Sequence, residues 1–149
     1  MEVKLRIAEK KDFPEINRLF ILMLQSIYNN KDLKGYGEND LDYYFEGSEN
    51  RIYLAEIGGN VAAFLSVELH REEETFIYYD DFSVEENYRN KGIGSLLMKE
   101  AENYAESKGI NKIVLHAEKS NKKAIGFYKK RGFTLLRDEG SRIAMIKYL

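Results

Sequence analysis

The chain has 149 residues, 44% of them hydrophobic and 32% charged, and it contains no Cys and only two His. This length fits one domain, which we expect to span residues 1–149. Without Cys, disulfides, thiolate metal sites and nucleophilic cysteine chemistry are excluded, and two His are too few for a multi-histidine centre, so we expect no metal. No apolar run approaches the roughly 20 residues that cross a bilayer, and early charges break a signal-peptide pattern, so we expect a cytoplasmic protein with no membrane partner.

Residue periodicity predicts strands and helices around one sheet. Asp12 and Pro14 are typical of a helix start. Gly109 and Gly132 are typical of helix ends, and Gly58-Gly59-Asn60 of a tight hairpin turn. In chain order the predicted elements are strand 3–7, helix 12–27, helix 38–45, strands 51–57, 61–69 and 75–84, helix 94–108, strand 112–116, helix 120–131, and strands 133–137 and 142–148. This order, β-α-α-β-β-β-α-β-α-β-β, predicts an α/β (α+β mixed-sheet) fold.

The segment 89–94, Arg-Asn-Lys-Gly-Ile-Gly, lies between the third strand of the meander and the next helix. Gly92 and Gly94 allow a tight turn and close approach to a ligand, and amides at a helix N-terminus attract anions. Arg89 and Lys91 add positive charge, so the segment is a candidate diphosphate site, with a plain turn as the alternative. A P-loop needs Gly-Lys-Ser/Thr and a dinucleotide fingerprint needs a third Gly, and neither is present.

This run resembles the acetyl-CoA-binding motif of the GNAT superfamily of N-acetyltransferases, Arg/Gln-x-x-Gly-x-Gly/Ala. Residues 121–133 are similar to the next motif of that family, and the first strand and helix fit its opening, so the resemblance covers essentially the whole chain. It implies a GNAT-like domain that moves an acetyl group from acetyl-CoA to a primary amine by direct attack. It also implies that acetyl-CoA is bound by Phe82, Ser83, Val84, Arg89, Asn90, Lys91, Gly92, Ile93, Gly94, Ser95, Asn121, Ala124 and Tyr128.

Tyr128 is the candidate general acid. The helix 120–131 places it one to two turns from Asn121 and Ala124, on the face expected to meet the cofactor. Its phenol can protonate the leaving CoA thiolate, whereas the alternative is a core aromatic beside Phe127. Asn121 either bonds the cofactor or simply begins the helix.

Asp80 and Asp81 are the candidate general base. They interrupt the alternation of an otherwise apolar strand, which is consistent with a β-bulge. Paired carboxylates raise each other's pKa and can leave one as a base near neutral pH. An exposed pair at a strand end is the alternative, and the family also uses water chains to remove the proton.

The acceptor is expected to be a cation. Residues 1–74 are net acidic and residues 75–149 net basic, although an ordinary solvated surface would look the same. The resemblance implies that residues 38–46 cover the acceptor site, and their carboxylates favour a small cationic amine or a peptide or protein amine: Glu38, Asp40, Asp42 and Glu46.

The remaining basic residues and the two histidines give less specific indications. The basic residues of 119–131 suit the adenosine 3′-phosphate or a solvated surface, and no nucleic-acid partner is expected, since the net charge is −2. His70 and His116 have no partner pattern and are interpreted as structural or surface residues. An edge strand near the C-terminus would allow a homodimer. The alternative function is a non-enzymatic CoA-binding or sensing module.

Overall fold

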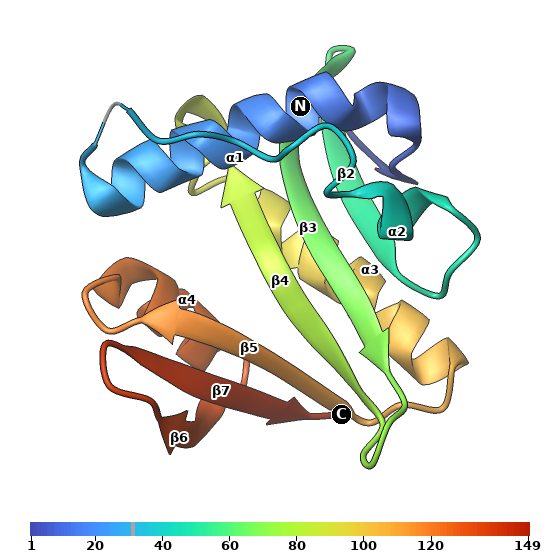
Figure 1. Cartoon of the computed structure of the whole chain (residues 1–149), viewed down its shortest axis with the longest axis vertical. Coiled ribbons are helices and arrows are strands. Elements are labelled where there is room, and N and C mark those ends of the chain that lie inside the picture. The colour runs from blue at the N-terminus through green and yellow to red at the C-terminus, as the bar shows by residue number, and fades with distance from the viewer. Residues whose placement is uncertain (31) are drawn as a thin grey trace.

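The computed structural model describes residues 1–30 and 32–149, and it shows one mixed sheet with helices on both faces (Figure 1). The elements are β1 (Val3–Ile7), a 3-10 turn (Lys10–Asp12), α1 (Phe13–Tyr28), α2 (Asp42–Phe45), β2 (Arg51–Ile57), β3 (Asn60–His70), β4 (Phe76–Val84), a second 3-10 turn (Glu86–Tyr88), α3 (Ile93–Ser107), β5 (Lys112–Glu118), α4 (Lys122–Lys130), β6 (Thr134–Asp138) and β7 (Arg142–Tyr148). Their order confirms the predicted α/β fold with a mixed sheet.

One predicted helix cap and one predicted helix start differ from the structure. Asp12 does not cap α1, because its carboxylate bonds the Arg6 guanidinium at 2.7 Å and accepts the Glu9 amide at 2.8 Å. The second helix begins at Asp42 rather than at residue 38. There the Asp40 carboxylate accepts the Gly37 amide at 2.7 Å, which favours a turn over a helix.

The strand order in the sheet is β1-β2-β3-β4-β5-β7-β6. All neighbouring pairs are antiparallel except β4 and β5, which run parallel. The last strand, β7, lies between β5 and β6, an arrangement that periodicity alone does not give.

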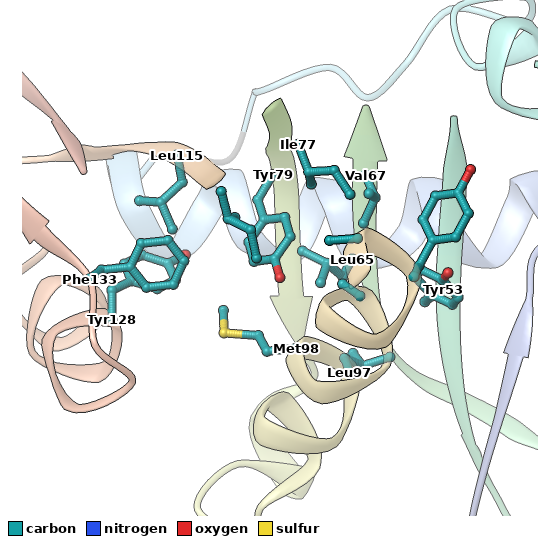
Figure 2. Packing of buried hydrophobic residues seen from close by; sticks show 14 of the residues in the cluster. Tyr53, Leu65, Val67, Ile77, Tyr79, Leu97, Met98, Leu115, Tyr128 and Phe133 are labelled. Carbon is teal, nitrogen blue, oxygen red and sulfur yellow. The ribbon is translucent and has the colours of Figure 1, made fainter. Parts of the chain in front are cut away.

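Two hydrophobic clusters hold the layers together, one on each face of the sheet. On one face, Leu97 and Met98 of α3 lie against Leu65 and Val67 of β3, as Figure 2 shows. Each fully buried aliphatic side chain of this kind contributes about 1.5–3 kcal/mol. On the other face, α1 and α2 pack through a smaller set: Ile16, Leu19, Leu41, Tyr44, Ile52, Leu54 and Phe64.

The sheet forks between β4 and β5. The two strands pair only from Ile77 to Tyr79 on β4, and they then diverge, as their arrows show in Figure 1. Backbone amides and carbonyls of β4 after Tyr79 therefore have no partner on the β5 side. An open edge of this kind inside a sheet can bind an extended ligand through main-chain hydrogen bonds.

A β-bulge lies on β4 at the fork. The pairing with β3 shifts by one residue between Leu65 and Val67, so Asp80 and Asp81 both lie opposite Ser66. This confirms the bulge expected from the broken alternation. Because of the bulge, two consecutive carboxylates face the same side of the sheet, the side that carries α1 and α2.

Contacts from α1 fix the far end of β4. The Ser83 hydroxyl donates to the Leu19 carbonyl at 3.2 Å, and Arg18 bonds the Val61 carbonyl at 3.3 Å and the carboxylate of Glu85. Helix α1 therefore closes one end of the fork, and the middle of the fork stays open.

Candidate active site

The fork opens into a groove of about 1140 Å³. Its walls come from β4, the start of α3, α4, β5 and the end of α1. Asp80, Asp81 and all but one of the predicted cofactor-binding residues line it; the exception is Lys91. The sequence motifs, which are far apart along the chain, therefore meet at one site.

A row of free backbone amides forms the wall at the start of α3. Among the residues that the structure describes, none of the amides from Asn90 to Ser95 donates a hydrogen bond, and no side chain caps the helix. The Arg89 guanidinium donates to the Val84 carbonyl at 2.8 Å, which holds this loop against the end of β4. Free amides at the positive end of a helix fit an anion such as a diphosphate.

The two glycines of this loop serve different purposes. Gly92 has a φ of +79°, and a Cβ atom there would meet no other atom within 4 Å, so the space above it is open to a ligand. A Cβ atom on Gly94 would lie 2.8 Å from Cζ of Phe82 and 3.1 Å from Cζ of Phe127. Gly94 therefore permits packing of two aromatic rings, and only Gly92 leaves room for a ligand.

We expect Gly92→Val to weaken acetyl-CoA binding at least about tenfold, roughly 1.4 kcal/mol, because the side chain would fill the open space. Gly109→Val is the matched control, since Gly109 also has a positive φ, +70°, with open space around it, but it lies at the other end of α3. Isothermal titration should show normal affinity in the control. Equal affinity in both folded variants would remove the cofactor assignment from this loop.

The wall formed by α4 is basic. Lys122, Lys123, Lys130 and Arg131 line the groove, and the Arg131 guanidinium lies 4.1 Å from the centre of the Phe127 ring. Arg131 Nε is buried without a hydrogen-bond partner. A buried donor on a basic wall suits a phosphate group.

Tyr128 projects from α4 into the core beside Leu115 and Phe133 (Figure 2). Its side chain is 9% exposed, yet it also lines the groove. Burial raises the pKa of Tyr128 above its ordinary value, so the phenol keeps its proton at neutral pH. The ring therefore packs in the core, as the alternative interpretation expected, and the residue also borders the groove.

The paired carboxylates, Asp80 and Asp81, also line the groove. The Tyr36 hydroxyl donates to Asp81, and the Tyr36 ring stacks on Phe20 of α1 at a centroid distance of 3.9 Å. Burial raises the pKa of Asp81. Desolvation, followed by the charges of Asp81 and Glu68, raises the pKa of Asp80 to about 7, although one side of Asp80 stays open to solvent.

Asn121 begins α4. Its Oδ1 accepts the Ala124 amide at 3.3 Å, so it caps the helix, and its side-chain NH₂ group donates to no described residue. Asn121 and Ala124 both line the groove.

The acidic residues expected at the acceptor site lie elsewhere. None of Glu38, Asp40, Asp42 and Glu46 lines the groove. Asp42 instead pairs with Lys10 at 3.4 Å, and Asp40 stabilises the turn at Gly37. Tyrosines in and just before this segment contribute hydroxyls instead: Tyr36 donates to Asp81, and Tyr44 donates to Glu68 at 3.1 Å.

Sequence reasoning missed one part of the groove. The Tyr78 hydroxyl lies 2.6 Å from His116 Nδ1, and both residues line the groove. The two strands were each predicted, but their pairing side by side was not.

Within residues 1–30 and 32–149, no group of three or more His, Cys, Asp or Glu side chains could hold a metal ion. In the same part of the chain, no helix is both long and apolar enough to cross a membrane.

Comparison with known proteins agrees with this geometry. Residues 21–133 match the model of the acetyltransferase (GNAT) family. YwnH of Bacillus subtilis (strain 168), named as a candidate phosphinothricin acetyltransferase, is 31% identical over 139 residues, which cover 87% of this chain and 82% of YwnH. The chain therefore belongs to the GNAT family and is an acetyltransferase.

Solved structures show the same fold at lower identity. PaiA N-acetyltransferase from Thermoplasma acidophilum, crystallised with coenzyme A, has a TM-score of 0.89 at 18% identity, over 100% of both chains. The ribosomal-protein-S18-alanine N-acetyltransferase of Escherichia coli has a TM-score of 0.77 at 18% identity, over 99% of this chain and 94% of that one.

Proposed function

We propose that this enzyme transfers an acetyl group from acetyl-CoA to the primary amine of a cationic acceptor. One observation carries the proposal: free amides, a basic wall and paired carboxylates all line a single groove. The amides and the basic wall suit the phosphates of acetyl-CoA, and the carboxylates suit an ammonium group.

The residues around the groove fit acetyl-CoA in three ways. The amides of 90–95 and the open space at Gly92 accept a diphosphate. The unpaired edge of β4, from Phe82 to Val84, accepts an extended pantetheine arm through main-chain hydrogen bonds. Arg131 and the α4 lysines provide charge for the remaining phosphate.

The paired carboxylates prepare the acceptor for attack. At pH 7 only about one in 2,500 molecules of a lysine-like amine is neutral, so removal of a proton is a large part of the work. Asp80, with a pKa of about 7, is half deprotonated near neutral pH and can take that proton. Asp81 holds Tyr36 in place and adds negative charge that attracts the ammonium.

Tyr128 acts on the other reactant, acetyl-CoA. As the carbon–sulfur bond breaks, a thiolate leaves, and a phenol that has kept its proton can protonate it. The surrounding core residues, Leu115 and Phe133, fix the ring and exclude water from its buried side.

The names of the relatives point to acceptors of two sizes: phosphinothricin for YwnH and an alanine of ribosomal protein S18 for the E. coli enzyme. The test should therefore include both small-molecule and peptide acceptors. Free thiol released from acetyl-CoA should be measured against a panel of diamines, aminoglycosides and peptides, with mass spectrometry of each acceptor.

We expect at least one amine to raise thiol release well above the amine-free rate, with one acetylated product formed per thiol. Tight binding of acetyl-CoA without amine-dependent release from any member of the panel would contradict the proposal. That result would favour a CoA-binding or sensing module.

A further inference from the structure

Tyr78, His116 and Glu139 form a chain of hydrogen bonds beside the proposed acceptor site. The Tyr78 hydroxyl lies 2.6 Å from His116 Nδ1, and His116 Nε2 lies 3.1 Å from Glu139 Oε1. The three residues come from β4, from β5 and from the turn between β6 and β7. A carboxylate, an imidazole and a hydroxyl in this order resemble the arrangement that enzymes use to activate a hydroxyl group.

This chain lies at the fork of the sheet. The last pair between β4 and β5 is Tyr79 with Leu115, so His116 is the first residue of β5 beyond it. Tyr78 and His116 line the groove together with Asp80. Tyr78 thus lies two residues before Asp80 on β4, and both residues border the same groove.

Glu139 is held as an anion. It accepts hydrogen bonds from Arg137 Nε at 2.9 Å and Arg142 Nε at 3.2 Å. Arg137, and to a lesser degree His116, lower the pKa of Glu139 below its ordinary range. The charged and titratable groups that face His116 are Tyr78 and Asp80 on β4, Glu118 on its own strand, and Arg137, Glu139 and Arg142 from the β6–β7 hairpin.

An ionised Glu139 selects one form of the imidazole. A carboxylate can only accept, so neutral His116 carries its proton on Nε2 and leaves Nδ1 as an acceptor. Burial raises the pKa of Tyr78 to about 12, so its hydroxyl keeps a proton to donate to Nδ1. The Tyr78 oxygen then retains a lone pair that can accept a proton from the groove.

The reaction removes two protons from the nitrogen. An ammonium group that becomes an amide nitrogen loses both, while the carbon–nitrogen bond forms and the carbon–sulfur bond breaks. Asp80 accounts for the first proton, which leaves before attack and then passes to water. The second leaves as Tyr128 gives its own proton to the thiolate, so a second acceptor beside the nitrogen allows both transfers to occur together, and Tyr128 afterwards regains a proton from water.

We propose that Tyr78, His116 and Glu139 take this second proton, an inference that rests on the proposed function. The N–H bond breaks as the Tyr78 oxygen gains a proton, and the original Tyr78 proton passes to His116 Nδ1. Glu139 stabilises the resulting imidazolium, which then releases the proton to water. Tyr78 and His116 are catalytic residues in this scheme, and Glu139 is a positioning residue.

The test compares Glu139→Gln with Asp138→Asn in the whole chain. Asp138 is the adjacent carboxylate, lies outside the groove and pairs with Lys119 at 2.8 Å, so the control makes the same change of charge in the same turn. With saturating acetyl-CoA and an accepted amine, we expect kcat of Glu139→Gln to fall about tenfold, with an unchanged KM for acetyl-CoA. The control should match the wild type.

A second variant removes the hydroxyl at the other end of the chain of hydrogen bonds. Tyr78→Phe, which keeps the ring, should show the same loss of kcat. If Glu139→Gln does not fold, the kcat of Tyr78→Phe tests the proposal by itself.

The inference is overturned if Glu139→Gln and Tyr78→Phe both turn over within about twofold of Asp138→Asn. Failure of the proposed function is distinct from these results, since the wild type itself would then release no thiol with any amine.

Discussion

Tyr128→Phe should lower kcat by about 10²-fold or more and leave the KM for acetyl-CoA nearly unchanged. The substitution removes one hydroxyl and keeps a ring that is 9% exposed and packed against Phe133, so the core should remain intact. Only the proton for the departing thiolate is lost. Steady-state kinetics by thiol release, with acetyl-CoA and amine varied in turn, measures both quantities.

Tyr79→Phe is the matched control for this experiment. Tyr79 is also a buried tyrosine of the same cluster, 3% exposed, but its hydroxyl has no hydrogen-bond partner and it does not line the groove. We expect wild-type kinetics from Tyr79→Phe. If Tyr128→Phe behaves like this control, a water molecule or another group protonates the thiolate.

Asp80→Asn should reduce kcat/KM about 10²-fold at pH 7 and change the shape of its pH profile. A raised pKa means that Asp80 is protonated, and inactive as a base, below about pH 7. The wild-type rate should therefore rise with pH and level off above about pH 7. The variant depends on amine that is neutral without help, so its rate should keep rising toward the amine pKa near 10.4.

Asp81→Asn provides the contrast. Because the bulge turns both carboxylates to the same face, this change should not be silent: it weakens the hydrogen bond that Tyr36 donates to Asp81. We expect a higher KM for the acceptor with the break near pH 7 retained. If both variants keep the wild-type profile, neither carboxylate is the base, and the acceptor loses its proton to water.

Local pattern was sufficient to predict the elements and the cofactor loop. Apolar periodicity and glycine stops define strands and helices within a few residues, because each depends on neighbours along the chain. The same holds for the bulge, which two consecutive Asp residues in an apolar strand indicate directly. The spacing of Arg89, Gly92 and Gly94 predicts an anion-binding loop, and the free amides of residues 90–95 fit that prediction.

Contacts between distant segments could not be predicted in this way. Asp42 looked like a groove residue by charge, yet Lys10, 32 positions earlier, pairs with it. His116 looked unpartnered until the parallel pairing of β4 and β5 placed Tyr78 beside it. Glu139 reaches the same site only because β7 lies between β5 and β6. Such contacts depend on strand order, which periodicity does not encode.

The central claim is that the paired carboxylates of the groove select a cationic amine for acetylation. The most direct test is kcat/KM for two acceptors of equal length, 1,4-diaminobutane and butylamine, and for two peptides that differ only in Lys or Glu beside the N-terminal amine. We predict that the more cationic member of at least one pair is acetylated about tenfold faster, and that the difference shrinks in Asp81→Asn. Equal rates within both pairs, or faster acetylation of the Glu peptide, would contradict the account.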